Sequence, residues 1–259
     1  TVATYFYRKG EYLKSGEYLF TKHIQPIDVL KKLTEGKSIL HKLVIPEGLN
    51  VKEILTLIQN EEKLTGEISN NITEGTLMPS TYYFTYNQQR QKIIELMQNK
   101  MIHHLEIANK LNKNPKIRTK EEILILASII EKEAAFDDEK NKIAAVFLNR
   151  LKKGMRLQAD PTTIYAITNG KYKLERKLNY NDLMIKSLYN TYYTAGLPKG
   201  PICCPGQKSI NAVVEPAKID SLYFVVDSRG GHIFSNSLKE HNKKVKDYRS
   251  FLRKKKNKT

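Results

Sequence analysis

Apolar residues recur at helical spacing in several stretches of the chain. Between residues 24 and 33 they stand at Ile27, Val29, Leu30 and Leu33, and Gly36 follows where a helix C-cap is expected. The same spacing predicts further helices over residues 51–58, 88–111, 123–137, 142–151 and 209–214.

Shorter apolar runs bounded by turn residues predict strands. Residues 40–45 form one such run, which ends at Pro46-Glu47-Gly48. Residues 222–226 predict a buried strand, and Gly230-Gly231 predicts a hairpin turn into residues 232–235. The mixture of helices and strands indicates an α+β fold class.

Three segments follow neither pattern. Asp160-Pro161 is a turn signal within residues 157–163. Residues 189–206 carry six glycines and prolines, too many for a helix or a central strand, so a loop is predicted there. The basic run at residues 253–258 is predicted to be a solvated, frayed end.

One predicted helix carries an acidic residue on its apolar side. Thr119 is a plausible N-cap for this helix. On a wheel of about 100° per residue with Leu126 at zero, Glu133 falls near 340°, in the middle of the apolar stripe. Glu131 falls near 140°, which directs it to solvent or to a polar neighbour. The two carboxylates are therefore expected to differ in behaviour.

Glu133 has two interpretations at this stage. Low-dielectric surroundings disfavour a carboxylate, raise its pKa and make it a general acid near neutral pH. Equally, a basic neighbour could satisfy Glu133 in a structural ion pair. The wheel alone leaves these alternatives evenly balanced.

Composition and charge narrow the class of protein. The 259 residues suffice for one large or two small domains at roughly 150 residues each, and 40% hydrophobic with 27% charged residues excludes a disordered or fibrous chain. A net charge of +17, from 44 basic and 27 acidic residues, favours nucleic acid, acidic membrane surfaces or carboxylate-bearing polymers as partners.

Targeting and cysteine signals are weak. The longest apolar runs fall far short of the roughly 20 residues of a transmembrane helix, and residues 1–20 lack the pattern of a secretory signal. Cys203 and Cys204 are adjacent, an arrangement that rarely forms a disulfide, so they do not reveal the redox compartment.

Many separated motifs carry a resemblance to a known family. They are residues 127–133 (ASIIEKE), 146–151 (VFLNRL), 154–162 (GMRLQADPT), 189–192 (YNTY), 196–198 with 200–202, 222–225, 231–235 (GHIFS) and 240–242 (EHN), with Glu74-Gly75, Pro79, Thr81 and Tyr82 before them. In this order they closely resemble the MltG (YceG-like) endolytic murein transglycosylases, over essentially the whole chain.

This resemblance implies lytic cleavage of the β-1,4 bond between N-acetylmuramic acid and N-acetylglucosamine in peptidoglycan, leaving 1,6-anhydro ends. It places the catalytic acid and base on Glu133, the second Glu of the Glu-Lys-Glu motif. The alternatives are a noncatalytic peptidoglycan-binding module and a water-using muramidase. Nucleic acid is not expected as a partner, because no recognised binding motif accompanies the charge.

The matching motifs supply candidate substrate-binding residues: Gln158, Asp160, Thr162, Tyr189, Asn190 and Tyr192. For Asp160 a turn-capping role beside Pro161 is an equal alternative. For the two tyrosines the alternative is packing, although aromatic residues in a loop suit sugar-face stacking. His232 and His241 make a poor metal site, so no metal and no cofactor are expected, and both are interpreted as hydrogen-bonding scaffold residues.

The resemblance also implies a domain organisation. Residues 1–45 are expected to be the later part of a LysM-like module of βαβ type, and residues 46–259 a larger mixed catalytic domain. A single-pass anchor in the bacterial cytoplasmic membrane, absent from this chain, would hold the catalytic region on the extracytoplasmic side beside cell-wall synthesis enzymes.

The sequence shows three departures from the family pattern: Ser80 where Asp is common, Lys199 where Pro is frequent, and the Cys203-Cys204 pair.

Overall fold

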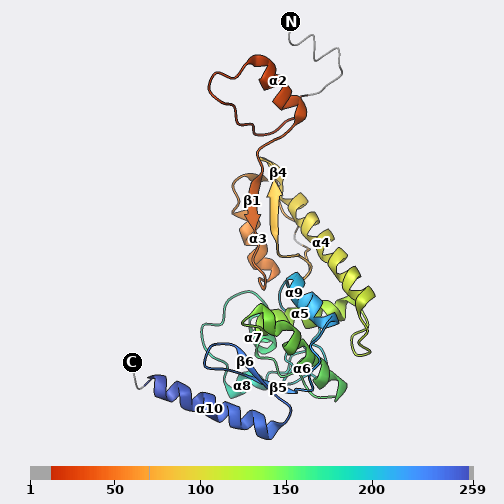
Figure 1. The fold of residues 1–259 in the computed structure, drawn as a ribbon, viewed down its shortest axis with the longest axis vertical. Coiled ribbons are helices and arrows are strands. Elements are labelled where there is room, and N and C mark those ends of the chain that lie inside the picture. The colour runs from red at the N-terminus through yellow and green to blue at the C-terminus, as the bar shows by residue number, and fades with distance from the viewer. Residues whose placement is uncertain (1–12, 70, 257–259) are drawn as a thin grey trace.

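A computed structural model describes residues 13–69 and 71–256 of the chain. The molecule is elongated, with α2 towards one end and α10 at the other (Figure 1). The helices are α2 (Pro26–Glu35), α3 (Val51–Gln59), α4 (Arg90–Leu111), α5 (Lys120–Glu133), α6 (Lys140–Lys152), α7 (Asp160–Thr168), α8 (Tyr180–Leu183), α9 (Gln207–Val214) and α10 (Leu238–Lys256), with a 3-10 turn η1 (Asp137–Glu139). The strands are β1 (His41–Val44), β2 (Leu64–Thr65), β3 (Thr81–Phe84), β4 (Gln88–Gln89), β5 (Tyr223–Val226) and β6 (His232–Ser235).

A smaller core lies in the N-terminal half of the molecule. β1 pairs antiparallel with β3, in the register Leu43 to Tyr82, and β2 pairs parallel with β4. Asn50 closes a capping box with Glu53, which satisfies backbone N–H groups at the start of α3. The apolar faces of α3 and early α4 pack on the sheet, with these buried members: Leu43, Ile45, Val51, Ile54, Ile58, Leu64, Leu77, Tyr82, Phe84, Ile93, Ile94, Met97 and Cys204.

The larger core surrounds α5. Thr119 and Glu122 form a capping box at the start of this helix, and every residue from Ile123 to Ile130 is buried. Helices α4, α6 and α9 pack around α5, so that its middle is buried on all sides. The helix ends at Glu133 because Ala134 has an extended backbone, with φ −69° and ψ 122°. This ending places Glu133 at the rim of the larger core.

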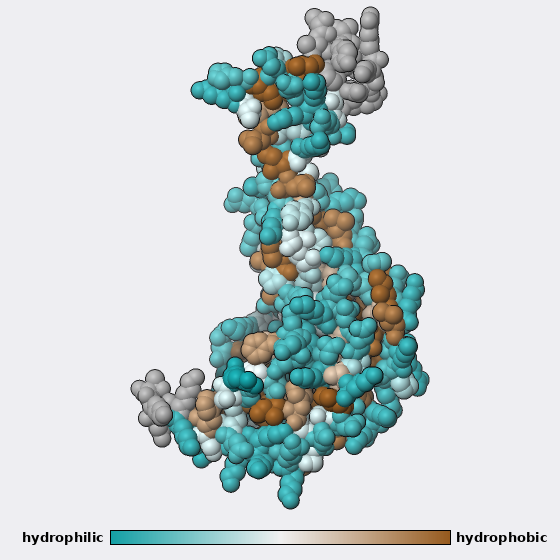
Figure 2. Space-filling view, viewed as in Figure 1, coloured by the Kyte–Doolittle hydropathy of each residue, from teal (hydrophilic) through white to brown (hydrophobic). Residues whose placement is uncertain are grey.

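The C-terminal segment adds a hairpin and a helix. β5 and β6 pair antiparallel, in the register Phe224 to Phe234, and Phe224 packs edge-on against Phe147 of α6. Helix α10 packs on both strands. Figure 2 shows that hydrophilic residues cover most of the visible face, as expected for a chain of net charge +17.

The main predicted elements are present, and the mixed α+β class is confirmed. The predicted helices correspond to α2, α3, α4, α5, α6 and α9, and the three predicted strands to β1, β5 and β6. Residues 189–206 form an irregular but well-defined loop. β5 is half-buried rather than buried, since its side chains are partly open to solvent.

Three predictions about local structure are wrong. Asp160-Pro161 begins helix α7, because proline in the first turn lacks only an N–H that would have no partner there. The tail at 253–256 is the end of α10 rather than frayed chain, and positions 257–258 lie outside the described residues. The helix predicted over 123–137 stops at Glu133.

The predicted boundary between residues 45 and 46 falls beside a strand that is shared by both sides. β1 precedes the boundary and β3 follows it, yet the two strands form one sheet. Helix α2, which precedes β1, has no buried residue. Two backbone hydrogen bonds hold this segment together: the Lys14 N–H donates to the Leu33 oxygen, and the Ile39 N–H donates to the Glu17 oxygen. The LysM-like character of this segment stays a prediction.

Candidate active site

A cavity of about 360 Å³ opens at the C-terminal end of α5. Its walls come from α5, α6, the segment that leads into α7, the loop 189–206, β5 and the first turn of α10. The lining residues are Glu133, Arg150, Leu157, Gln158, Asp160, Tyr192, Tyr223, Phe224, Leu238, His241 and Asn242. It thus gathers the predicted acid with polar and aromatic groups from five other segments.

Glu133 is a half-buried carboxyl with an altered acidity. Burial raises its pKa to about 8; the negative charge of Asp160 adds to this effect, and the positive charge of Arg150 opposes it. No hydrogen bond or ion pair of its carboxylate occurs among the described residues 13–69 and 71–256. Glu133 is therefore protonated near neutral pH, as a general acid must be.

Arg150 of α6 lines the cavity and binds two of its wall segments. Its buried guanidinium donates to the backbone oxygens of Leu222 and Leu157, both at 2.7 Å, and lies 5.1 Å from the centre of the Tyr223 ring. These bonds connect α6 to the residue before β5 and to the segment before α7. Burial lowers the pKa of Arg150. The sequence analysis did not select Arg150 as a site residue, although it stands within the 146–151 motif.

Three predicted substrate-binding residues lie beside Glu133. The Tyr192 hydroxyl donates to Oδ1 of Asp160 at 2.6 Å, and burial raises the pKa of Tyr192. Asp160 stands in the first turn of α7, where the helix dipole favours negative charge. Gln158 has a left-handed backbone with φ 52°, a conformation that costs a residue other than glycine about 1–3 kcal/mol. Such strain is common at functional sites.

The structure does not bring the other three predicted residues to this cavity. Thr162 is fully buried and hydrogen-bonds Thr191. Asn190 is also fully buried, and its side-chain amide donates to the backbone oxygens of Leu183 in α8 and of Ile185. Tyr189 packs against Tyr165 with the two rings tilted by 53°, and it lines a larger, mainly apolar cavity of about 710 Å³ near the start of α5. Tyr189 and Tyr192 therefore line different cavities, although they belong to the same loop.

Two histidines that sequence analysis treated alike differ in the structure. His232 is a scaffold residue, since its Nδ1 lies 2.8 Å from Oε2 of buried Glu139. His241 instead lines the cavity, together with Leu238 and Asn242. The spacing of these three residues places them on one face of α10. Sequence analysis missed this wall because it predicted no helix there; the Ser237-x-x-Glu240 capping pattern was the available signal.

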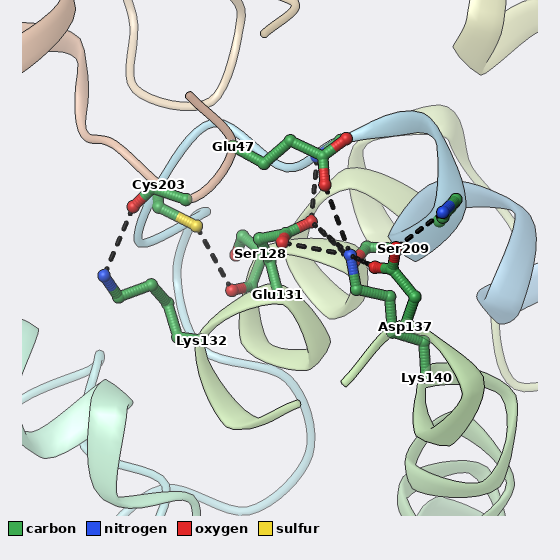
Figure 3. Close-up of polar contacts among 11 residues, drawn as sticks. Glu47, Ser128, Glu131, Lys132, Asp137, Lys140, Cys203 and Ser209 are labelled. Atoms are coloured by element: carbon green, nitrogen blue, oxygen red, sulfur yellow. Dashed lines mark hydrogen bonds and ion pairs between the residues drawn. The ribbon is translucent and has the colours of Figure 1, made fainter. Parts of the chain in front are cut away.

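Glu131 lies in a separate, fully satisfied network on another face of α5 (Figure 3). Its Oε2 accepts hydrogen bonds from Ser209 Oγ at 2.6 Å and from the Gly206 N–H at 2.9 Å, and its Oε1 lies 3.1 Å from Lys140 Nζ. Lys140 also pairs with Glu47 and Asp137. The expectation that Glu131 meets a polar neighbour is confirmed.

The described residues 13–69 and 71–256 hold no metal-binding cluster, two buried thiols and no membrane-spanning helix. Within them no cluster of three or more histidine, cysteine or acidic side chains is arranged to hold a metal ion. Cys203 and Cys204 are both buried free thiols, and burial raises the pKa of each. The helices in this part of the chain are all too short or too polar to cross a membrane.

Comparisons with known proteins agree with the sequence motifs. The model of the YceG-like family matches residues 1–247. An endolytic murein transglycosylase of Bacillus subtilis (strain 168) is 34% identical over 274 residues, which cover 93% of this chain and 75% of that protein. One from Streptococcus pneumoniae (strain ATCC BAA-255 / R6) is 28% identical, over 93% of this chain and 52% of its own length.

A solved structure is also similar. The 2.6 Å crystal structure of a putative yceG-like protein from Listeria monocytogenes has a TM-score of 0.64 and 32% sequence identity to this chain. The likeness covers 93% of this chain and 89% of the Listeria chain.

Proposed function

Since this chain belongs to the YceG-like family, we propose that it is an endolytic murein transglycosylase. Its substrate is the peptidoglycan glycan strand, and it cleaves the β-1,4 bond between N-acetylmuramic acid and N-acetylglucosamine. The relatives from Bacillus and Streptococcus support this activity by their names. The observation that carries the proposal is a protonated carboxyl, Glu133, in a cavity lined with polar and aromatic groups.

Glu133 acts first as an acid and then as a base. It donates its proton to the glycosidic oxygen, the bond from that oxygen to C1 of the muramic acid breaks, and the leaving sugar departs with a hydroxyl group. The 6-hydroxyl of the same muramic acid then attacks C1 and gives its proton to the Glu133 carboxylate. The product is a 1,6-anhydro end, and the enzyme returns to its protonated state without consuming water.

One carboxyl is sufficient for this route. Glycosidases that use water or a covalent intermediate need two carboxyl groups, set about 5–9.5 Å apart. Here the substrate supplies its own nucleophile. Asp160 has a different role, because its charge raises the pKa of Glu133 and keeps the proton available. Gln158, Asp160 and Tyr192 bind hydroxyl or acetamide groups of the sugars. Thr162 and Asn190 stabilise the segments that carry them. Tyr189 contacts the glycan strand outside the Glu133 cavity.

A digest of purified peptidoglycan tests the function. The wild-type protein is expected to release anhydro-ended glycans, and Glu133→Gln is expected to release none while still binding strands. Glu62→Gln, at an exposed position outside both cavities, is the matched control and should remain active. Equal product from Glu133→Gln would reject the assignment.

The mass of the products separates the alternatives. A muramidase adds one water to each new reducing end, whereas the proposed reaction adds none. A binding module retains strands but yields no product at all.

Two further features of the proposal rest on the family resemblance. Residues 1–45 would belong to a LysM-like module, and the full-length protein would be anchored in the bacterial cytoplasmic membrane with its catalytic region outside, beside wall-synthesis enzymes. The +17 charge supports attraction to anionic lipid heads and to carboxylate-bearing muropeptides. Fractionation of cells that express the full-length gene would test the location, and a purely soluble cytoplasmic protein would contradict it.

A further inference from the structure

The first turn of α10 places His241 in the wall of the Glu133 cavity. Ser237 accepts the Glu240 N–H at 3.2 Å, and the Glu240 carboxylate accepts the Asn236 N–H at 3.2 Å, so the start of the helix is capped from both directions. A capped turn has little freedom to fray. His241 is thus presented to the cavity by a rigid element rather than by a mobile loop.

The His241 ring is fixed by stacking. It lies nearly parallel to Tyr223, at an interplanar angle of 25° and a centroid distance of 5.2 Å. Tyr223 is in turn covered by the guanidinium of Arg150. The orientation of the imidazole is therefore set by contacts that make no use of its two nitrogens.

The two ring nitrogens have different surroundings. Nδ1 is buried and has no hydrogen-bond partner. Within the described part of the chain, Nε2 also has no partner, but it does not share the complete burial of Nδ1. A proton on Nδ1 would be buried without an acceptor, whereas a proton on Nε2 remains available to a ligand. This favours the tautomer that carries its proton on Nε2.

The charge state agrees with this arrangement. Burial lowers the pKa of His241, and the nearby positive charges of Arg150 and Lys244 lower it further. The ring is therefore neutral at pH 7, where Glu133 still holds its proton, and it carries one N–H donor.

We propose that His241 is a substrate-binding residue, whose Nε2–H donates a hydrogen bond to an oxygen of the N-acetylated sugar held beside Glu133. This inference rests on the proposed function and deepens it. It distinguishes His241 from His232, whose ring is already bound by Glu139. The stacked Tyr223 and His241 rings then form one polar-edged wall of the sugar site.

Two substitutions separate hydrogen bonding from packing. His241→Phe keeps an aromatic ring to stack on Tyr223 but removes both nitrogens, and His241→Gln loses the ring but keeps an N–H donor. Binding of peptide-free glycan strands is measured by calorimetry in proteins that also carry Glu133→Gln, so that no strand is cleaved. We expect His241→Phe to weaken binding by about tenfold, the value of a single hydrogen bond to a sugar, and His241→Gln to retain affinity within about threefold of the parent. His103→Phe, at an exposed position of α4, is the matched control.

Two outcomes overturn the inference, and a third separates it from the proposed function. If His241→Phe binds strands as the parent does, the ring serves packing alone. If His241→Gln loses as much affinity as His241→Phe, the donor has no role. If the wild-type protein forms no anhydro products but His241→Phe still weakens strand binding, then the proposed reaction fails while the binding role stands.

A second measurement needs no substitution at His241. The nitrogen resonances of His241 are followed by NMR in the Glu133→Gln protein as glycan strands are added. The Nε2 resonance is expected to shift while the resonances of exposed His103 stay constant. An unmoved Nε2 resonance at saturating strand concentration rejects the contact.

Discussion

Glu131 and Glu133 stand two residues apart on α5 but have opposite environments. Glu131 receives hydrogen bonds from Ser209 and Gly206 and an ion pair from Lys140, whereas Glu133 faces a cavity with no protein partner in the described chain. A helical period of 3.6 separates the two directions, so sequence alone could predict that they differ. It could not predict which residues would meet each carboxyl, because those come from distant segments.

The acidity of Glu133 predicts an alkaline limit to activity. Its folded pKa of about 8 means that the carboxyl holds its proton below pH 8 and loses it above. Release of anhydro-ended glycans should therefore fall about tenfold per pH unit above pH 8. The initial rate is measured from pH 5 to pH 10 with uncleaved strands as substrate. An alkaline limit centred near pH 4.5 would show that Glu133 has an ordinary acidity or is not the acid.

Asp160 is expected to tune this limit. Its negative charge raises the pKa of Glu133, so Asp160→Asn should lower that pKa and move the alkaline limit of activity to lower pH. The same substitution leaves the amide able to meet the Tyr192 hydroxyl. Glu62→Gln, at an exposed position outside both cavities, should leave the limit in place. A limit that does not move in Asp160→Asn would show that Asp160 is electrostatically remote from the acid.

At the scale of elements, periodicity identified the helices that form the cores and missed α7 and α10, which complete the site. Helix α5 shows a long apolar run and a Thr119 cap, both legible in sequence. Helix α7 begins at a proline that also signals a turn, and α10 is so rich in lysine that its apolar positions stand out poorly. The walls of the cavity depend on both, so the cavity itself could not be predicted.

The network around Glu131 should contribute strongly to stability. The side chains of Glu131 and Lys140 are only 8% and 4% exposed, and removal of one leaves the other charge buried with fewer partners. Glu131→Ala is expected to lower the free energy of unfolding by about 3–5 kcal/mol, as measured by urea denaturation. Glu106→Ala, which removes an exposed ion pair to Lys120, should cost at most about 1 kcal/mol. Equal losses in the two variants would contradict a special role for the buried network.

At the scale of the whole molecule, the loop 202–206 joins the two cores. The Gly48 N–H donates to the backbone oxygen of Cys204 at 3.0 Å, and the Cys204 N–H donates to that of Leu49 at 2.8 Å. On the other side, Ser128 of α5 accepts the Ile202 N–H at 3.0 Å. Cys204 itself is buried in the smaller core. Such long-range contacts leave no local signal in the sequence.

Helix α2 lies outside both cores and should open independently. None of its residues is buried, whereas α5 is buried from Ile123 to Ile130. Amide hydrogen exchange followed by NMR should therefore be at least ~100-fold faster in α2 than in the middle of α5, because α2 can unfold locally. Comparable protection in the two helices would mean that α2 unfolds only with the rest of the chain.

The cavity draws its walls from Glu133 to Asn242, and α10 provides the last of them. Since a chain is synthesised from its N-terminus, the larger core can begin to assemble while α10 is still inside the ribosome. A ribosome-bound nascent chain consequently holds its acid in an open half-site, and the pocket is completed only when α10 has left the ribosome. Because α10 follows every other wall of the cavity in the chain, the acid and the rest of its pocket are never enclosed before that helix folds.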